Sequence, residues 1–195
     1  MSFIKYRASV ADADLLIHLG KADCLDILEH LFDEVVVPKY ILDNEMLKKN
    51  RYQRTKVAQY NRKNSSALFQ FKDKEQNKAF KSIVNRERSE MLKYVDQGEA
   101  ECCGYAKALK IEIIISDNKN DYPDMEERGY ILLGHRDLLP LLVFFNLMSK
   151  QDVESIYNTI NAGMSKKSSF SFDETYDRSL QRIREKGWSE KLGFI

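Results

Sequence analysis

The sequence predicts an α/β domain in which a parallel sheet is covered by helices. Four short apolar segments have the length of strands, and longer segments with apolar residues at helical spacing separate them. Strands that alternate with helices are typical of βαβ units, in which consecutive strands run parallel. A chain of 195 residues is a suitable length for one such domain.

The first two strands are expected at residues 3–11 and 34–37. In residues 3–11 apolar side chains alternate with polar ones, and the segment leads directly to Asp12. Leucines at helical spacing follow, with Gly20 marking a break between two helices. The β-branched run at 34–37 is typical of a buried parallel strand that ends at Pro38, where another helix begins.

The middle of the chain is expected to be a basic helical insertion at about residues 48–93. It lacks Gly and Pro and has a looser joint near residues 64–66. From Leu47 to Lys93 there are 14 Lys and Arg against 4 Asp and Glu, whereas the remainder has 17 against 26. A basic segment on an acidic body indicates contact with a polyanion such as nucleic acid. The alternative is a solvated helical pair with a small aromatic core of its own.

The last two strands are expected at residues 111–116 and 130–133. A helix of small residues begins at Gly98 and feeds the first of them, IEIIIS, which ends at Asp117. A short helix and Gly129 separate the two segments. This order of a helix followed by a strand completes the βαβ pattern.

The end of the chain, residues 151–195, is expected to be a helical extension packed on the domain of residues 1–150. Ser171 opens the sequence Ser-Phe-Asp-Glu, which is typical of the start of a helix. Trp188 and Phe194 are expected to dock this tail or to be buried against a second copy of the chain, so a homodimer is one expected partner.

The composition favours a cytoplasmic protein that does not enter a membrane. The longest apolar run, residues 138–148, is far shorter than the about 20 residues of a membrane span, and the N-terminus lacks the apolar stretch of a signal peptide. Three cysteines, two of them adjacent, do not form a disulfide framework. Neither they nor His18, His30 and His135 have the CxxC or HxxxH spacing of a zinc site.

Carboxylates follow the predicted strands. Asp12 and Asp117 come directly after strands, Glu101 lies early in the helix before the third strand, and Asp43 or Glu45 lies in the helix after the second. Ligands of open α/β sheets bind beyond the carboxyl ends of the strands, so these acids are expected to converge there. Mg²⁺ and Mn²⁺ prefer oxygen ligands and, when bound, activate water and stabilise charge on a phosphodiester.

Structural roles compete with this interpretation. A single aspartate at the end of a strand is more often a helix cap or a turn residue than a catalytic group. Asp14 is expected to be such a cap, and Glu99 a solvated acid in the first turn of its helix. His135, Arg136 and Asp137 follow the last strand, where they are expected either to contact phosphate or metal or to form a turn with ion pairs.

Several segments, in their order and spacing, resemble successive motifs of PIN-domain proteins. They are DADLLI at residues 12–17, the following LGKADCLDILEHLFDEVVVP, the helix opening GEAECCGYAKAL and the strand end IIISD. The resemblance covers roughly residues 5–150 and is closest to a prokaryotic branch with a GEAE helix. It implies a three-layer α/β/α fold with a parallel sheet of about five strands. It also implies a metal-dependent nuclease site, often in toxins of toxin–antitoxin pairs.

The resemblance assigns three acids directly. Asp12 corresponds to the family's first acid, Glu101 to the third and Asp117 to the fourth, and all three are expected to bind Mg²⁺ or Mn²⁺. The family often has a further aspartate after the fourth acid, where Asn118 stands here. Asp121 or Asp124 would have to replace it.

The second acid departs from the family pattern. The family usually has a glutamate six residues after the proline of the VxVP step, where Asn44 stands here. Asp43 and Glu45 flank this position. Glu45 is preferred because apolar residues bracket it as they bracket the acid of the family.

The function expected from these features is that of a metal-dependent endoribonuclease, with Asp12, Glu45, Glu101 and Asp117 as catalytic acids. RNA is the expected substrate, and an antitoxin protein is a further expected partner. The residues expected to contact nucleic acid are Lys48, Lys49, Arg51, Tyr52, Arg54, Arg62, Lys63 and Arg136.

Two other functions compete. The sequence DAD also resembles the DxD motif of haloacid-dehalogenase-like phosphatases, with Asp12 as nucleophile and Asp14 as acid and base. Leu15, which stands where that family prefers Thr or Val, argues against it. The second alternative is a PIN-like module that binds nucleic acid or protein without catalysis, because Asn44 and Asn118 replace acids.

Overall fold

The computed structural model describes residues 3–165 and 167–194 and contains one all-parallel sheet of five strands. Its order is β3-β2-β1-β4-β5, and every neighbouring pair is parallel. The strands are β1 (Tyr6–Ala11), β2 (Phe32–Pro38), β3 (Phe69–Lys72), β4 (Ile113–Ile115) and β5 (Ile131–Leu133). The predicted three-layer α/β/α fold is therefore confirmed.

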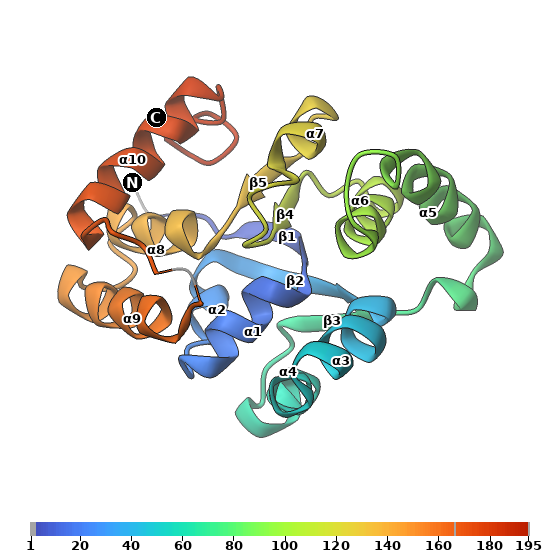
Figure 1. Ribbon diagram of the computed structural model, residues 1–195, viewed down its shortest axis with the longest axis horizontal. Helices are drawn as coiled ribbons and strands as arrows, with labels where there is room; N and C mark the ends of the chain where they lie inside the picture. Colours follow the sequence, from blue (N-terminus) through green and yellow to red (C-terminus); the bar gives the residue numbers. More distant parts are fainter. Residues whose placement is uncertain (1–2, 166, 195) are drawn as a thin grey trace.

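Helices cover both faces of the sheet (Figure 1). One face carries α1 (Ala13–Lys21), α2 (Ile27–Leu31), the π-helical turn η1 (Ile41–Met46), α3 (Leu47–Lys49), α4 (Arg51–Asn64), α8 (His135–Phe144) and α9 (Lys150–Gly163). The other face carries the 3₁₀ turn η2 (Lys74–Gln76), α5 (Lys78–Met91), α6 (Gln97–Leu109) and α7 (Tyr122–Glu127). The last helix, α10 (Phe172–Glu185), packs on α8.

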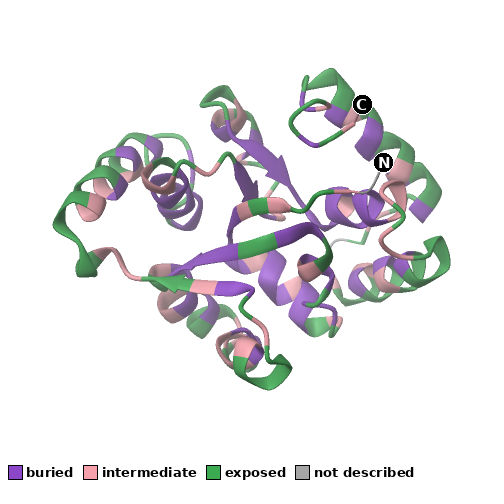
Figure 2. Ribbon diagram, turned by 180° about the vertical axis from the view of Figure 1, so that it is seen from behind, coloured by how far each residue is buried: buried purple, intermediate pink, exposed green. Residues whose placement is uncertain are grey.

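Strands of a parallel sheet that are covered on both faces are continuously apolar in the sequence, as β4 and β5 are. All residues of β4 and β5 are buried, and so are Val10 and Ala11 at the end of β1. Figure 2 shows buried residues along the strands and on the inner sides of the helices, and exposed residues on the outer helices. The three cysteines are free and buried in this core, as predicted.

The predicted helical insertion at 48–93 is wrong at residues 69–72. After α4, Ser65 adopts a left-handed conformation and the chain enters β3, which pairs with β2 through Phe69 and Val35. The alternation of FQFK is too short to stand out between two basic helices, although it buries Phe69. Because β3 is the edge strand of the sheet, the basic segment belongs to the core architecture.

The helical tail begins as predicted. Ser171 caps α10 by accepting a hydrogen bond from the Glu174 N–H, and the Glu174 carboxylate accepts one from the Ser171 N–H. Trp188 is buried, and the Phe194 ring stacks on Phe144 with centroids 4.3 Å apart. Both aromatic residues thus pack within the chain.

Membrane insertion of a helix finds no support in the part of the chain that the structure describes. No helix there combines the length and the apolar composition that a membrane crossing requires.

A glycine allows α5 and α6 to pack closely. A Cβ atom at Gly104 of α6 would lie 2.7 Å from the backbone oxygen of Val84 in α5. Backbone atoms cannot move away as the end of a flexible side chain can, so this position requires glycine. The close contact fixes α6, which carries the acid Glu99 discussed below.

Gly104→Ala is therefore expected to lower the free energy of unfolding by about 1–3 kcal/mol through overpacking. Urea denaturation followed by circular dichroism measures this change. Gly163→Ala is the control, because a Cβ atom at Gly163 would meet no atom within 4 Å. Equal unfolding midpoints for the two variants would contradict the proposed packing constraint.

Candidate functional site

Asp12 lies at the carboxyl end of β1 and is almost fully buried, with 1% of its surface exposed. Its backbone N–H donates to the Ile115 carbonyl at 2.9 Å, which extends the pairing of β1 with β4. One carboxylate oxygen, Oδ2, accepts hydrogen bonds from the Ser116 hydroxyl and the Asp14 N–H. The other oxygen, Oδ1, is buried and has no hydrogen-bond partner among the described residues.

Asp12 is surrounded by like charges. Burial raises its pKa well above the ordinary value, and the nearby carboxylates of Glu99, Asp14 and Glu45 raise it further. No described Lys or Arg lies within ion-pair distance of Asp12. Asp12 is the N-cap of α1, because its carboxylate accepts a hydrogen bond from the Asp14 N–H. It is also a buried acid without a cationic partner among the described residues.

Glu45 reaches this cluster from the π-helical turn η1. A Cβ atom at Gly98 would lie 2.3 Å from a Glu45 carboxylate oxygen, so the side chain rests against the first turn of α6. A π-helical turn contains one residue more than the corresponding α-helical turn. The family pattern places the second acid at position 44, where Asn44 stands. The extra residue of the π-helical turn accounts for its replacement by Glu45, one position later. Asp43 instead forms an ion pair with Arg54 at 2.7 Å.

Glu99 is the acid that α6 contributes to the cluster. It is 5% exposed, so the prediction of a solvated first-turn acid is wrong. Its Oε1 accepts a hydrogen bond from the Asn118 side-chain amide at 2.9 Å, and the same amide donates to Asp121 at 3.1 Å. Burial raises the pKa of Glu99, and the charges of Asp121 and Glu45 add to this increase. Asp96, Glu99 and Asp121 also bring carboxylate oxygens within 4.8 Å of one another.

Lys49 provides positive charge at the edge of the cluster. Its ammonium group lies 2.9 Å from an Asp14 oxygen and 3.4 Å from a Glu45 oxygen. Asp14 is therefore an ion-pair partner of Lys49, and the prediction of a helix cap at Asp14 is wrong. The hollow beside these residues has a volume of about 340 Å³, and Lys48, Asn118 and Glu99 also line it.

The residues of this cluster fit a hard divalent cation. Carboxylate and amide oxygens are the ligands that Mg²⁺ and Mn²⁺ prefer, and neither ion needs a closed cage of protein ligands. The unpartnered Oδ1 of Asp12 and the raised pKa values of Asp12 and Glu99 indicate negative charge that the described residues do not compensate. Asp96, Glu99 and Asp121 bring carboxylate oxygens close enough for one ion, and Asp12 and Glu45 add negative charge beside them.

Glu101, the third predicted acid, lies elsewhere. Its side chain is 1% exposed, accepts two hydrogen bonds from the Lys74 ammonium at 2.7 and 2.9 Å, and lies 3.0 Å from the Arg88 guanidinium. Residues two apart in an α-helix point in directions about 200° apart, so Glu99 and Glu101 cannot face the same rim. The helical phase of α6 was the signal that could have identified Glu99.

Asp117, the fourth predicted acid, is held by two histidines. The residue aligned with Asp12 across the strand pair is Ser116, because Ala11 pairs with Ile115, and the Ser116 hydroxyl donates a hydrogen bond to Asp12. Asp117 lies one residue further along, between α1 and α8. There it contacts His18 and His135.

Only four of the residues predicted to bind nucleic acid lie at or near the acid cluster. Lys48 and Lys49 line its hollow, and Arg51 and Tyr52 open α4, with Tyr52 68% exposed. The remaining predicted residues lie apart from this group. Arg54 is paired with Asp43, Arg62 and Lys63 lie at the far end of α4, and Arg136 lies in the first turn of α8.

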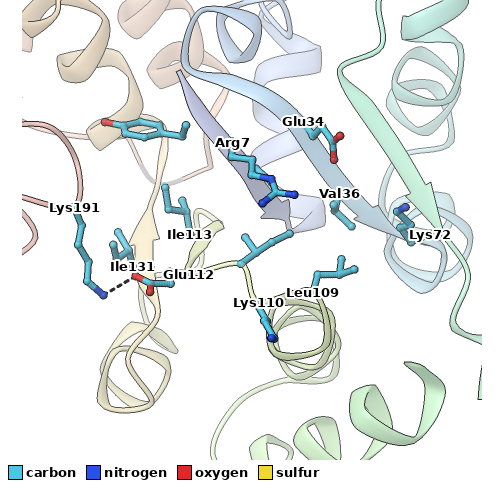
Figure 3. A pocket seen from close by; sticks show the side chains of 13 residues that line it. Arg7, Glu34, Val36, Lys72, Leu109, Lys110, Glu112, Ile113, Ile131 and Lys191 are labelled. Carbon is cyan, nitrogen blue, oxygen red and sulfur yellow. Dashed lines mark hydrogen bonds and ion pairs between the residues drawn. The ribbon is translucent and has the colours of Figure 1, made fainter. Parts of the chain in front are cut away.

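A larger hollow, of about 590 Å³, lies away from the acid cluster. Figure 3 shows it beside Arg7, Glu34 and Lys110, with Lys191 paired to Glu112 at its edge. It is formed by the amino-terminal parts of β1, β4 and β5, whereas the acids follow the carboxyl ends of the strands. Size alone therefore does not identify the functional site of this chain.

Comparison with known families gives one match. A family model described as a PIN domain matches residues 8–185, which is most of the chain and includes every acid of the cluster. The comparison with curated proteins gives no match.

Asp12→Asn is expected to stabilise the protein in the absence of divalent metal. The folded pKa of Asp12 is raised above the unfolded value of about 3.9. Above about pH 4 the folded state therefore binds more protons at this position than the unfolded state, and stability falls as pH rises toward the folded pKa. Asn retains the capping role and does not titrate, so the variant does not lose stability in this way as pH rises. The advantage of the variant, measured by urea denaturation in EDTA, should grow with pH.

Added Mn²⁺ should reverse the order of the two proteins. At a metal concentration 100 times Kd, binding stabilises the parent by about 2.7 kcal/mol, and the variant by much less. Asp33→Asn, a change at an exposed carboxylate of β2, should behave as the parent does. A metal-induced stabilisation of equal size in Asp12→Asn would show that Asp12 does not hold the ion.

Proposed function

We propose that this chain, which belongs to the PIN-domain family, is a metal-dependent nuclease that cleaves RNA. PIN domains are generally nucleases, so the family supports the broader activity. The observation that carries the proposal is the buried carboxylate of Asp12, with one oxygen unpartnered, beside Glu45 and Glu99 at the carboxyl end of the sheet. The choice of RNA follows the family resemblance.

The residues of the cluster have separate roles in this proposal. Asp12, Glu45 and Glu99 bind Mg²⁺ or Mn²⁺, and Asn118 orients Glu99 and Asp121 through its side-chain amide. The bound ion supplies Lewis acidity and positive charge at the phosphodiester. Lys49, held by Asp14 and Glu45, is placed to contact a phosphate once the ion neutralises the acids.

The start of α4 is the proposed path of the nucleic acid. Lys48 and Lys49 lead from the hollow to Arg51, and these cations attract phosphates. The exposed ring of Tyr52 is available for stacking on a base. Helix α4 has 14 residues and rises about 1.5 Å per residue, so Arg62 and Lys63 lie far from Arg51. They would contact a nucleic-acid strand only if it ran along the whole helix.

The geometry favours this function over both alternatives. A phosphatase that used Asp12 as nucleophile would use Asp14 as acid and base, whereas Asp14 is paired with Lys49 and the chain matches the PIN family over residues 8–185. A non-catalytic module was suggested by Asn44 and Asn118. Glu45 stands in the cluster despite Asn44, and Asn118 joins two of its acids.

Cleavage of a mixed pool of RNA with Mn²⁺ tests the proposal. Asp12→Asn and Glu99→Gln should each reduce the rate by about 100-fold or more, because each removes a metal ligand. Asp33→Asn should leave the rate unchanged, and single-stranded DNA assayed in parallel measures the preference for RNA. If both Asp12→Asn and Glu99→Gln cleave RNA at the rate of the parent, the proposed site is wrong.

A further inference from the structure

A second polar cluster lies between α1 and α8, beside the segment that follows β4. It consists of His18 from α1, Asp117 from the segment after β4 and His135 at the start of α8. The Nδ1 atom of His18 lies 2.6 Å from Asp117 Oδ2, and that of His135 lies 2.9 Å from Asp117 Oδ1. One ligand atom from each residue lies within 4.8 Å of the other two. Three separate elements therefore hold these groups together.

The charge of Asp117 needs compensation. Its side chain is 4% exposed, and burial acts to raise its pKa, but His135 and His18 outweigh burial and lower the pKa below the ordinary value. Asp117 is therefore an ionised buried carboxylate. Glu101, which is buried to a similar degree, has the permanent cations Lys74 and Arg88. Among the described residues only imidazoles lie within ion-pair distance of Asp117.

Two imidazoles and one carboxylate are a set of ligands that transition metals prefer, whereas Mg²⁺ and Ca²⁺ prefer oxygen alone. We propose that His18, Asp117 and His135 bind a transition-metal dication, with Zn²⁺ as the first candidate, at a site separate from the acid cluster. A bound dication would give the buried Asp117 carboxylate a cationic partner besides the two imidazoles. This proposal does not rest on the proposed nuclease activity.

The cluster needs only a small adjustment to hold the ion. Bonds of about 2.0–2.2 Å to Zn²⁺ place two tetrahedral ligands about 3.3 Å apart, so the two histidine–carboxylate distances must each open by less than about 1 Å. The side chain of His18 is 22% exposed, which gives the ion a route of entry. Binding through Nδ1 leaves a proton on the buried, unpartnered Nε2 of His135, which lowers the affinity that the site reaches.

The proposed ion has a structural consequence for the acid cluster. Asn118 follows Asp117 directly and donates its side-chain amide to Glu99 and Asp121. An ion that joins α1, the Asp117 segment and α8 fixes the backbone that carries this amide. The second site would thus hold in position the segment that carries Asn118.

Titration of the metal-free protein with Zn²⁺ and Co²⁺ tests this inference. All proteins carry Asp12→Asn, so that the acid cluster does not contribute. We expect one ion per chain, with the visible absorption of Co²⁺ bound by nitrogen and oxygen in tetrahedral geometry. His18→Gln and His135→Gln should each weaken Zn²⁺ binding by about 100-fold or more. His30→Gln, which changes an exposed histidine of α2, should have no effect.

Urea unfolding with and without Zn²⁺, and RNA cleavage by the same proteins, complete the test. His18→Gln removes a contact of the buried Asp117 carboxylate and should unfold in EDTA at a lower urea concentration than its parent, whereas added Zn²⁺ should raise the unfolding midpoint of the parent alone. The proposal is overturned if Co²⁺ gives no such absorption, or if Zn²⁺ binds equally well to His18→Gln and His30→Gln. Loss of RNA cleavage in Asp12→Asn with retained Zn²⁺ binding would separate this site from the nuclease site.

Discussion

The burial of Asp12 among other carboxylates is the constraint on which this structure depends. The end of β1 lies at the centre of the sheet, so Asp12 is enclosed by β4, α1 and α6 and has almost no contact with solvent. Burial and like charge both disfavour its ionised form. The molecule therefore either keeps a proton there or binds a cation, and this choice links its stability to its chemistry.

Small local features of the backbone determine which acids belong to the cluster around Asp12. The π-helical turn η1 brings Glu45 to the rim, Gly98 leaves room for the Glu45 carboxylate, and the phase of α6 selects Glu99 over Glu101. Directly after β4, Ser116 contacts Asp12, and Asp117 contacts the two histidines. Adjacent residues after one strand thus serve two clusters.

The sequence was sufficient for the fold because β4 and β5 are continuously apolar, and because the alternating segment that forms β1 leads directly to Asp12. The sequence was insufficient to identify a site residue where two residues of similar chemistry lie close together in the chain. Glu99 and Glu101 differ only in helical phase, which the starting residue of α6 sets. The edge strand β3 was missed because four residues carry little periodic signal, and its pairing partner β2 lies far away in the chain.

Binding of Mn²⁺ to Glu99→Gln and Glu101→Gln tests the central claim most directly, because the two changes are identical and lie two residues apart on α6. Glu99→Gln should weaken Mn²⁺ binding, measured by titration calorimetry, about 100-fold or more, whereas Glu101→Gln, once shown to be folded by circular dichroism, should stay within about twofold of the parent. Equal losses in the two variants, or a loss in Glu101→Gln alone, would contradict the account.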